Sequence, residues 1–411
     1  MSTLRHIYTC IDIGSDSIKI VVCELYHGRY NLLASSTIKS KGIKKGLITD
    51  VNEAKNSVKK GFEQIESMLG FKIKKVIAII PSYFAEFNMI KGEIDVKNQE
   101  ITGEDIIKVL QTAMKNNLDN TKEMVTIIPI DFTLDNEVTN EPLGKVSSTL
   151  KTRGILASAP RKNIYSVVNL LNSLGIEVID ISFGAIGDIN TFMDDNVVNT
   201  ISAVVNIGAE KTEVSLYNKG IIVKHSIVNM GSKSVDHDIA YMYKVNLETA
   251  RELKEKFSLP QRNSASLNEF KEAKNKDGEV IKINQYELSE IVISRIDEIL
   301  SLVNQELNGL TSHKPTFIFI TGGITNMTNF QQICREKLGK CAIIGSVNLI
   351  GLRNNKFSSA IGNIIYFVNK LKLKGKDYSM VNNDEMEILS TPRKNTNDSM
   401  LGKVFGYFFG E

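Results

Sequence analysis

The sequence has no run of about 18 to 20 apolar residues, the length that an α-helix needs to cross a bilayer. Its first residues, MSTLRHIYTC, contain no apolar signal region either. We therefore expect a soluble protein that stays in the cytoplasm. Its charges are balanced, with 50 Lys and Arg residues against 47 Asp and Glu residues. This balance argues against a general nucleic-acid binder, so a charged partner must be recognised by a local patch.

Common patterns of cysteine, histidine and nucleotide-loop chemistry are missing too. No C-x-x-C pair joins the four cysteines, and the five histidines are scattered without an H-E-x-x-H motif. Walker A, G-x-G-x-x-G and G-x-S-x-G sequences do not occur. Reactive thiols, a metal site built on histidine and histidine-based catalysis are therefore poor hypotheses for this chain.

What the chain does contain is a β-meander that occurs twice. Its 411 residues are enough for more than one domain. Apolar runs at 7–13, 18–25 and 30–34, joined by glycine-containing turns, predict three antiparallel strands. A similar pattern begins near residue 203, and three landmarks align at a nearly constant spacing: Asn206 with Asp12, Gly208 with Gly14, and Gly220 with Gly28. Two such meanders predict a duplicated α/β domain.

The other elements are distributed along the chain. Helical spacing predicts helices at 51–69, 102–114, 164–175, 246–257, 286–307 and 358–371. Apolar runs predict strands at 75–80, 125–134, 149–157 and 316–320. Residues 84–168 lack the glycine-centred hairpins and are predicted to be an inserted unit, whereas 261–280 is expected to be a polar loop. Residues 372–398 lack periodicity and are expected to be a flexible linker.

The turn of the first meander is a candidate for binding an anion. Gly14 lets the backbone approach a ligand closely, and Ser15 and Ser17 add hydroxyl donors. Asp12 could hold Mg²⁺ through water, and Lys19 could reach a phosphate. One such hairpin is usually only a hairpin, but two of them facing each other across a cleft would clamp a polyphosphate.

A third turn adds to the pattern. Thr321-Gly322-Gly323 follows a buried strand and offers a surface without side chains, which suits the sugar and base of a nucleotide. The next residue is Ile324, and we expect its side chain to narrow the room for the base.

In this order the motifs resemble the actin, Hsp70 and sugar-kinase superfold of duplicated ribonuclease H-like domains, and within it the FtsA family of bacterial cell-division proteins. CIDIGSDSIK (10–19) is similar to the family's first phosphate loop, VVNIGAEKT (204–212) to its second, and FITGGITNM (319–327) to its adenosine loop. The segment 127–144 is similar to the family's extended segment, and 230–240 to the stretch that leads into subdomain 2B. The resemblance covers essentially the whole chain.

The resemblance implies a division into subdomains. Subdomain 1A would comprise 1–83, 169–200 and 345–371, and subdomain 1C, inserted in place of actin's 1B, would comprise 84–168. Subdomain 2A would comprise 201–235 and 316–344, and subdomain 2B would comprise 236–315. The linker at 372–398 would lead to an amphipathic membrane-targeting helix at 399–411.

The resemblance also implies that ATP and Mg²⁺ bind between these subdomains. The implied nucleotide-binding residues of the two phosphate loops are Asp12, Gly14, Ser15, Asp16, Ser17, Lys19, Asn206, Gly208, Ala209, Glu210, Lys211 and Thr212. Those that follow in the chain are Gly231, Glu252, Lys254, Thr321, Gly322, Gly323, Ile324 and Asn326. Asp12 would hold the Mg²⁺ through water.

The second loop favours binding over hydrolysis. Phosphoryl transfer to water needs a metal against the phosphates and a polar group that orients the water. Asn206 cannot carry the negative charge that helps to hold a metal, and Glu210 would repel a phosphate unless it turns away. Ser182-Phe183-Gly184, where relatives place a catalytic Gln or Glu, offers no base, and Asp188 is expected to be a helix-dipole partner. We therefore expect slow or absent hydrolysis and assign no catalytic residue.

The last residues have an amphipathic pattern. A helix there would carry the apolar residues Met400, Leu401, Val404, Phe405, Phe408 and Phe409, most of them on one broad face that can lie in a bilayer interface. Three glycines and a single lysine make one copy a weak anchor, so stable attachment should need several copies linked in a polymer. The alternative is that the tail packs onto the globular part.

With these features, the resemblance implies an adaptor that binds ATP, polymerises in an actin-like way on the cytoplasmic face of the membrane at the division site, and tethers the tubulin-like protein FtsZ there. The C-terminal peptide of FtsZ would bind subdomain 2B, other division proteins would bind subdomain 1C, and no nucleic acid is expected. Two alternatives stay open. One is an adaptor of the PilM kind from pilus assembly, and the other is a small-molecule kinase, which would need an acidic base facing a closed pocket.

Overall fold

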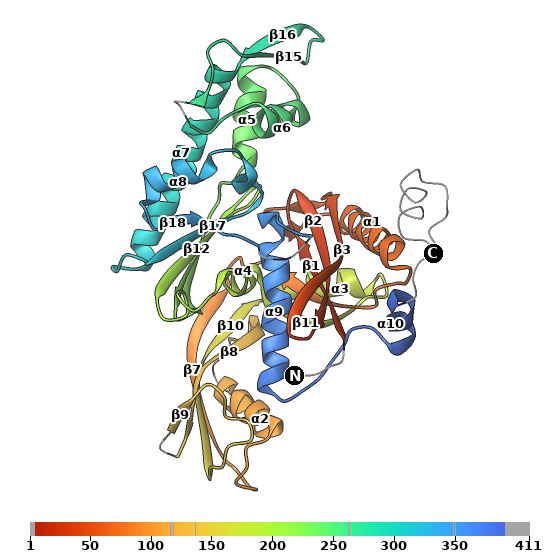
Figure 1. The fold of residues 1–411 in the computed structure, drawn as a ribbon, viewed down its shortest axis with the longest axis vertical. Helices are drawn as coiled ribbons and strands as arrows, with labels where there is room; N and C mark the ends of the chain where they lie inside the picture. The colour runs from red at the N-terminus through yellow and green to blue at the C-terminus, as the bar shows by residue number, and fades with distance from the viewer. Residues whose placement is uncertain are drawn as a thin grey trace, which may run out of the picture.

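The structure is a computed structural model that describes residues 5–115, 117, 119–135, 137–261, 264–347, 349 and 351–390. Two lobes are each built on a five-stranded sheet (Figure 1). Both sheets follow one plan, in which three consecutive strands are antiparallel and two further strands lie parallel beside the first of them. This shared plan confirms the predicted duplicated α/β domain.

The first sheet contains β1 (His6–Ile13), β2 (Ser17–Tyr26), β3 (Arg29–Lys39), β6 (Lys75–Ile80) and β11 (Glu177–Phe183). Their counterparts in the second sheet are β12 (Ile201–Ile207), β13 (Thr212–Asn218), β14 (Ile221–Val228), β17 (Phe317–Thr321) and β18 (Ala342–Ile344). Strand β3 extends beyond the predicted end at residue 34, because it stays paired with β2 as far as Lys39 opposite Ser17.

Helices cover both faces of the first sheet. Ile7 and Ile11 of β1 belong to the apolar layer formed with α1 (Val51–Leu69) and α3 (Arg161–Asn172), and Tyr8 and Cys10 belong to the layer formed with α9 (Ser358–Leu373). This alternation follows from the two-residue period of a strand. Burial raises the pKa of the Cys10 thiol well above its usual range, which agrees with the prediction of an unreactive cysteine.

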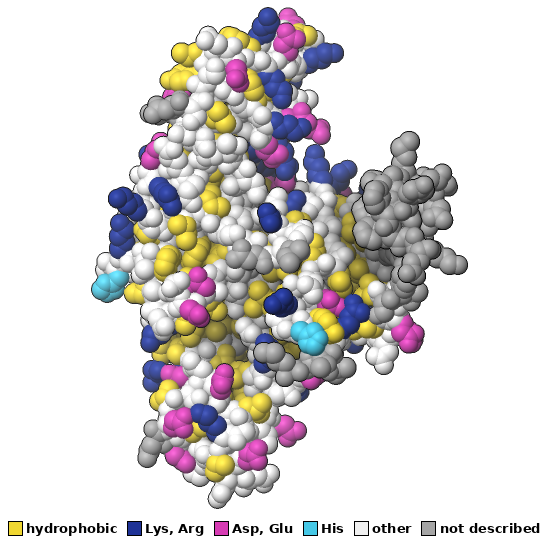
Figure 2. Space-filling model, viewed as in Figure 1, with side chains coloured by type: hydrophobic (Ala, Val, Ile, Leu, Met, Phe, Trp, Pro, Cys, Tyr) yellow, Lys and Arg dark blue, Asp and Glu magenta, His cyan; other side chains and the backbone are white. Residues whose placement is uncertain are grey.

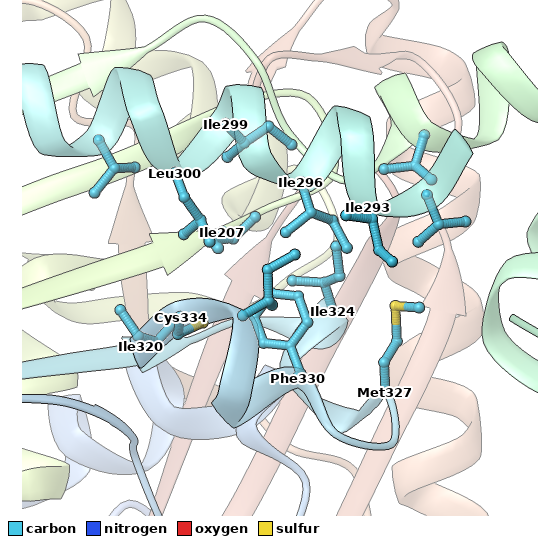
Figure 3. Packing of buried hydrophobic residues seen from close by; sticks show 14 of the residues in the cluster. Ile207, Ile293, Ile296, Ile299, Leu300, Ile320, Ile324, Met327, Phe330 and Cys334 are labelled. Atoms are coloured by element: carbon cyan, nitrogen blue, oxygen red, sulfur yellow. The ribbon is translucent and has the colours of Figure 1, made fainter. Parts of the chain in front are cut away.

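The second lobe is covered by the long helix α7 (Gln285–Leu310) and by α8 (Phe330–Leu338). Helix α7 begins where the Asn284 side chain accepts hydrogen bonds from the N–H groups of Tyr286 and Glu287. Figure 3 shows its residues Ile293, Ile296, Ile299 and Leu300 packed against side chains of the sheet and of α8. This core fixes the position of the loop that follows β17.

An arm extends from the second lobe and contains α5 (Lys233–Met242), α6 (Leu247–Lys256) and a hairpin of β15 (Phe270–Lys274) and β16 (Val280–Asn284) (Figure 1). We call it the 2B arm. The hairpin corrects the prediction of a polar loop at 261–280. Asp277 and Gly278, the latter with φ +86°, form its turn. Its strands are only partly buried and carry too many polar side chains to be predicted from hydrophobicity.

The inserted unit has a four-stranded antiparallel sheet of β7 (Glu86–Asp95), β10 (Thr149–Pro160), β8 (Lys122–Leu134) and β9 (Glu137–Thr139). Helix α2 (Gly103–Met114) packs on it and begins with a capping box, in which Thr102 and Asp105 each accept from the other's backbone N–H. Ile106, Val109 and Phe132 lie in its separate small core. Helix α4 (Gly184–Phe192) returns the chain to the junction of the lobes.

The C-terminal part of the described chain corrects the prediction of a flexible linker from residue 372. Helix α9 continues to Leu373, and residues 374–390 pack on the first lobe, ending in α10 (Asn383–Ser390). The Met380 N–H donates to the Ile7 carbonyl (2.9 Å), and the Ile7 N–H donates to the Ser379 hydroxyl (3.1 Å). We call residues 376–390 the C-terminal strap. Residues 391–398 and the predicted membrane helix at 399–411 lie outside the described residues.

The structure contains no membrane-spanning candidate among its described helices, none of which is both long and apolar enough.

Candidate functional site

A cavity of about 540 Å³ lies between the two lobes. The turns after β1 and β12 line it, together with α6 of the 2B arm and the short helices η2 (Gly323–Asn326) and η3 (Asn355–Phe357). Its volume falls in the range of small-molecule sites, about 300 to 1,000 Å³. The duplicated turns therefore meet at a space of the right size for a nucleotide.

The first turn is tight and rich in hydrogen-bond donors. The Gly14 N–H donates to the Ser17 carbonyl (3.2 Å), and a Cβ at Gly14 would lie 3.0 Å from that oxygen. The Ser15 hydroxyl accepts from the Gly46 N–H (2.7 Å), which ties the turn to the β4–β5 hairpin (Ile43–Lys44 and Leu47–Ile48). The β4–β5 hairpin thus supports the turn at the edge of the cavity that both of them line.

The second turn repeats this geometry. The Gly208 N–H donates to the Lys211 carbonyl (2.9 Å), the counterpart of the Gly14 to Ser17 bond. Gly231 packs against its backbone, where a Cβ would lie 2.6 Å from the carbonyl oxygens of Gly208 and Ala209. Gly231 therefore shapes the turn from behind and does not line the cavity.

The third turn closes the cavity from the second lobe. Gly322 has φ +102°, and a Cβ there would lie 2.2 Å from the Ile207 carbonyl oxygen, so the position admits only glycine. Gly323 faces open space. The Ile324 side chain packs mainly in the core of the second lobe near Ile296 and Phe330 (Figure 3), and the residue also lines the cavity, so the expected narrowing of the space for a base stays a prediction.

Most of the predicted site residues line this cavity: Asp12, Gly14, Ser15, Asp16, Ser17, Lys19, Asn206, Gly208, Ala209, Glu210, Lys211, Lys254, Gly322, Gly323, Ile324 and Asn326. Thr212 and Thr321 lie behind it, where their hydroxyls donate to the carbonyls of Met230 (2.8 Å) and Asn355 (3.2 Å). Glu252 is not among the lining residues and pairs with Lys256 (3.4 Å) on the surface of α6.

Glu210 is held by other groups at the cavity wall. Its carboxylate accepts from the Lys45 N–H (2.6 Å) of the first lobe and pairs with Lys233 (2.9 Å) of α5. Although partial burial works to raise the pKa of Glu210, these donors bring it below its ordinary value. The negative charge is thereby neutralised locally, which lessens the repulsion expected towards a phosphate.

A buried carboxylate that sequence reasoning missed connects the lobes. The Glu213 carboxylate pairs with Lys211 (2.7 Å) and accepts a hydrogen bond from the Ser82 hydroxyl of the first lobe. Although burial opposes it, the Lys211 charge lowers the pKa of Glu213 to about 2. Glu213 follows Lys211 by two residues at the start of β13, and this spacing, which favours one face in extended chain, was the available signal.

Further cations lie around the cavity. Arg251 of α6 pairs with Asp16 (2.7 Å) of the first turn, and Lys254 pairs with Asp236 (2.7 Å). Lys356 of η3 also lines the cavity, and partial burial together with nearby Lys19 and Arg251 lowers its pKa. Lys19, Lys211 and Lys254 were predicted, whereas Arg251 and Lys356 were not, because they reach the cavity through the packing of distant segments. The cations favour an anionic ligand.

Asp188 is not the helix-dipole partner that was expected. It lies in the middle of α4 and is 1% exposed. Its carboxylate accepts from the hydroxyls of Ser358 (2.6 Å) and Ser359 (2.8 Å) and from the Asn206 amide nitrogen (2.8 Å). Burial raises the pKa of Asp188 to about 6, against the effect of these donors. The residue thus joins α4, α9 and the end of β12 directly behind the cavity.

Within the described part of the chain, no group of three or more His, Cys, Asp or Glu side chains could hold a metal ion by itself. Asp12, which pairs with Lys19 (2.7 Å), and Asn206 nevertheless bring oxygen atoms to the cavity wall. Mg²⁺ commonly keeps several waters and binds through phosphates and one or two carboxylates. The donor set therefore fits a hydrated cation that arrives with a polyphosphate ligand.

Comparison with known protein families gives two matches. The family described as "Cell division protein FtsA" matches residues 203–362, and the family described as "SHS2 domain inserted in FTSA" matches residues 86–157. The FtsA protein of Bacillus subtilis is 25% identical over 384 residues, which cover 90% of this chain and 86% of that protein. FtsA of Enterococcus hirae is 26% identical over 368 residues, covering 88% and 83%.

Solved structures share the fold at low sequence identity. A chain of the PilM-PilN type IV pilus biogenesis complex has a TM-score of 0.59 at 12% identity, covering 88% of this chain and 98% of its own. MreB5 of Spiroplasma citri bound to ADP has a TM-score of 0.56 at 12% identity, covering 90% and 98%. These similarities agree with the predicted actin-like fold.

Proposed function

Because the chain belongs to the FtsA family of cell division proteins, we propose that its interlobe cavity binds ATP with Mg²⁺. The pair of matched turns carries this proposal: the bond from Gly14 to Ser17 and the bond from Gly208 to Lys211 shape two turns on one cavity. Backbone N–H groups in such turns hold phosphate oxygens well. The open space at Gly323 leaves room for the nucleoside.

We propose that hydrolysis is slow or absent. An acid that activates or orients water must be free to contact it in the site. Glu213 is committed to Lys211 and Ser82, and Asp188 is enclosed behind Asn206. Asp188 does not line the cavity, and the ion pair with Lys211 lowers the pKa of Glu213 to about 2, which makes Glu213 a weak base towards an attacking water.

Binding and turnover can be measured on the same preparation. Titration with a fluorescent ATP analogue in the presence of Mg²⁺ should show saturable binding that unlabelled ATP competes away. Phosphate release should stay far below about 1 s⁻¹, the lower end for kinases. Absence of binding would reject the nucleotide site, and release near about 1 s⁻¹ would reject only the proposal of slow hydrolysis.

We propose that the protein is an adaptor that polymerises on the cytoplasmic face of the membrane at the division site and ties FtsZ to it through the predicted tail. The FtsZ C-terminal peptide would bind the 2B arm, which exposes the large apolar side chains Tyr241, Met242, Phe270 and Val280. Large apolar side chains exposed on one arm support a protein contact there.

Other division proteins would contact the inserted unit. A second cavity of about 650 Å³ lies between that unit, α4, α9 and the β13–β14 turn, and its lining includes Ile128, Leu143 and Tyr366. Figure 2 shows hydrophobic side chains on the surface where the inserted unit meets the lobes. An apolar groove at this junction supports binding of a partner's segment.

The adaptor role is tested by sedimentation. FtsZ is mixed with liposomes alone, with the full chain, and with a chain lacking residues 399–411. Only the full chain should carry FtsZ into the pellet, while the truncated chain should still bind ATP. Equal pelleting by both chains would contradict the role of the tail.

Two alternatives have separate outcomes. An adaptor of the PilM kind would recruit a membrane partner's peptide and leave protein-free liposomes unbound. A small-molecule kinase would transfer phosphate to an acceptor, and no residue described above is placed as its base.

A further inference from the structure

The starting point is the orientation of one amide at the end of β12. The Asn206 Nδ2 donates to the Asp188 carboxylate (2.8 Å), which lies behind the cavity wall, and to the Ser359 hydroxyl (3.3 Å) beside it. The amide nitrogen has two hydrogens, and these two acceptors use both. The oxygen of the amide is on the opposite side, so Asn206 presents an acceptor to the cavity that it lines.

Asp188 determines this orientation. An ionised carboxylate only accepts hydrogen bonds, so the neighbouring amide can face it only with its nitrogen. Asp188 is itself fixed, because the Ser358 and Ser359 hydroxyls donate to its other oxygen (2.6 and 2.8 Å). Helices α4 and α9 are also in close backbone contact, since a Cβ at Gly362 would lie 1.7 Å from the Gly187 carbonyl oxygen. This contact leaves the two helices little room to move relative to each other.

Asp188, directly behind Asn206, therefore carries the negative charge that the Asn206 side chain lacks. A carboxylate that accepts from a ligand group orients that group and increases its basicity. Hydrated Mg²⁺ presents water hydrogens, which require an acceptor, whereas an amide nitrogen would present hydrogens to hydrogens. The second turn thus presents a hydrogen-bond acceptor to the cavity, as a carboxylate at position 206 would.

We propose that Asp188 is a positioning residue that holds the Asn206 amide oxygen towards the nucleotide site, where it accepts a hydrogen bond from water on the Mg²⁺ of the bound nucleotide. This inference rests on the proposed nucleotide-binding function. If Asp188 only connected α4 and α9, its replacement would change the affinity for the nucleotide equally with and without Mg²⁺. The dependence of affinity on Mg²⁺ separates the two roles.

The test measures the dissociation constant of a fluorescent ATP analogue with Mg²⁺ and with EDTA, and takes their ratio. The wild-type chain should bind more tightly with Mg²⁺. In Asp188→Asn the new amide can donate to Asn206, which then turns its own nitrogen to the site. The Mg²⁺ advantage should fall about tenfold, the lower end for loss of such an outer partner, while affinity in EDTA changes less than about twofold.

Three further variants make the result independent of one substitution. Asn206→Ala removes the oxygen and leaves the serine bonds to Asp188, so it should lose the same Mg²⁺ advantage. Asn206→Asp alone places two carboxylates side by side and should lower the melting temperature. Asn206→Asp combined with Asp188→Asn exchanges the groups and should restore both the melting temperature and the Mg²⁺ advantage.

Ser358→Ala is the matched control. It removes one of the two hydroxyls that donate to the Asp188 oxygen away from Asn206, while the Ser359 bond (2.8 Å) still holds that oxygen in place. The melting temperature should therefore fall and the ratio should stay unchanged. A normal ratio in Asp188→Asn and in Asn206→Ala would overturn the inference. Equal losses with Mg²⁺ and with EDTA would overturn it too, in favour of the structural role. A wild-type chain that binds no ATP would instead reject the proposed function itself.

Discussion

Replacing Glu213 by Gln tests how much the buried pair with Lys211 contributes to stability. The pKa of Glu213 is about 2 in the fold, against an ordinary 4.5, and this difference corresponds to about 3 kcal/mol of stabilisation at neutral pH. Breaking a buried pair and leaving one charge behind costs a similar amount, about 3 to 5 kcal/mol. Glu213→Gln should therefore lower the free energy of unfolding by about 3 kcal/mol at pH 7.

The pH dependence of this loss follows from the direction of the pKa shift. Because the folded pKa lies below the unfolded one, the stabilisation is fully present above about pH 4.5 and is lost as the pH falls towards 2. The difference between wild type and Glu213→Gln should shrink to about 1 kcal/mol at pH 3. Comparing the two proteins at each pH removes most of the contribution of groups that titrate in both.

Urea unfolding followed by circular dichroism provides the measurement. Glu63→Gln is the control, because Glu63 forms an exposed pair with Lys59 (3.7 Å) and should cost less than about 0.5 kcal/mol. A Glu213→Gln protein as stable as wild type at pH 7 would show that the pair adds nothing. A difference that stays constant down to pH 3 would refute the linkage to the Glu213 carboxylate.

Three further predictions follow from single contacts. Gly322→Ala places a Cβ within 2.2 Å of the Ile207 carbonyl oxygen, so it should weaken binding of a fluorescent ATP analogue at least about tenfold. In Gly323→Ala the Cβ points into open space, and this variant should bind the analogue within about twofold of wild type. Met380→Ala removes a buried side chain of the C-terminal strap and should lower the unfolding free energy by about 2 to 5 kcal/mol, while Ile388→Ala at an exposed position should change it by less than about 0.5 kcal/mol. Deleting residues 399–411 should abolish co-sedimentation with vesicles and leave the melting temperature unchanged, and continued sedimentation would reject the anchor.

The two phosphate-type turns can be predicted from the sequence because their shape is local. Gly14 and Gly208 each close a bond to a residue three positions later, and strands on either side are evident from apolar runs. The duplication can then be recognised from the nearly constant spacing of three aligned residue pairs. The same reasoning locates Gly322, since a buried strand leads directly into it.

The parts that sequence reasoning missed depend on segments that are distant in the chain. Asp188 contacts Asn206 and Ser358, 18 and 170 residues away, so no local pattern shows its role. Arg251 reaches Asp16 across 235 residues. The strap was missed because its apolar residues lack a regular period. It also pairs with a part of β1 that β6 does not reach, since the β1–β6 pairing covers only Cys10 and Ile11.

The C-terminal strap limits how the molecule can stand on a surface. Met380 is fixed to Ile7, and only residues 391–398 separate the end of α10 from the proposed membrane helix at 399–411. Eight residues reach at most about 30 Å when fully extended. On the proposed anchoring, the first lobe is therefore kept next to the lipid headgroups. The 2B arm belongs to the other lobe, remote from α10 (Figure 1). On the same proposal, a filament built from such subunits would turn one edge to the bilayer and its 2B arms to the cell interior.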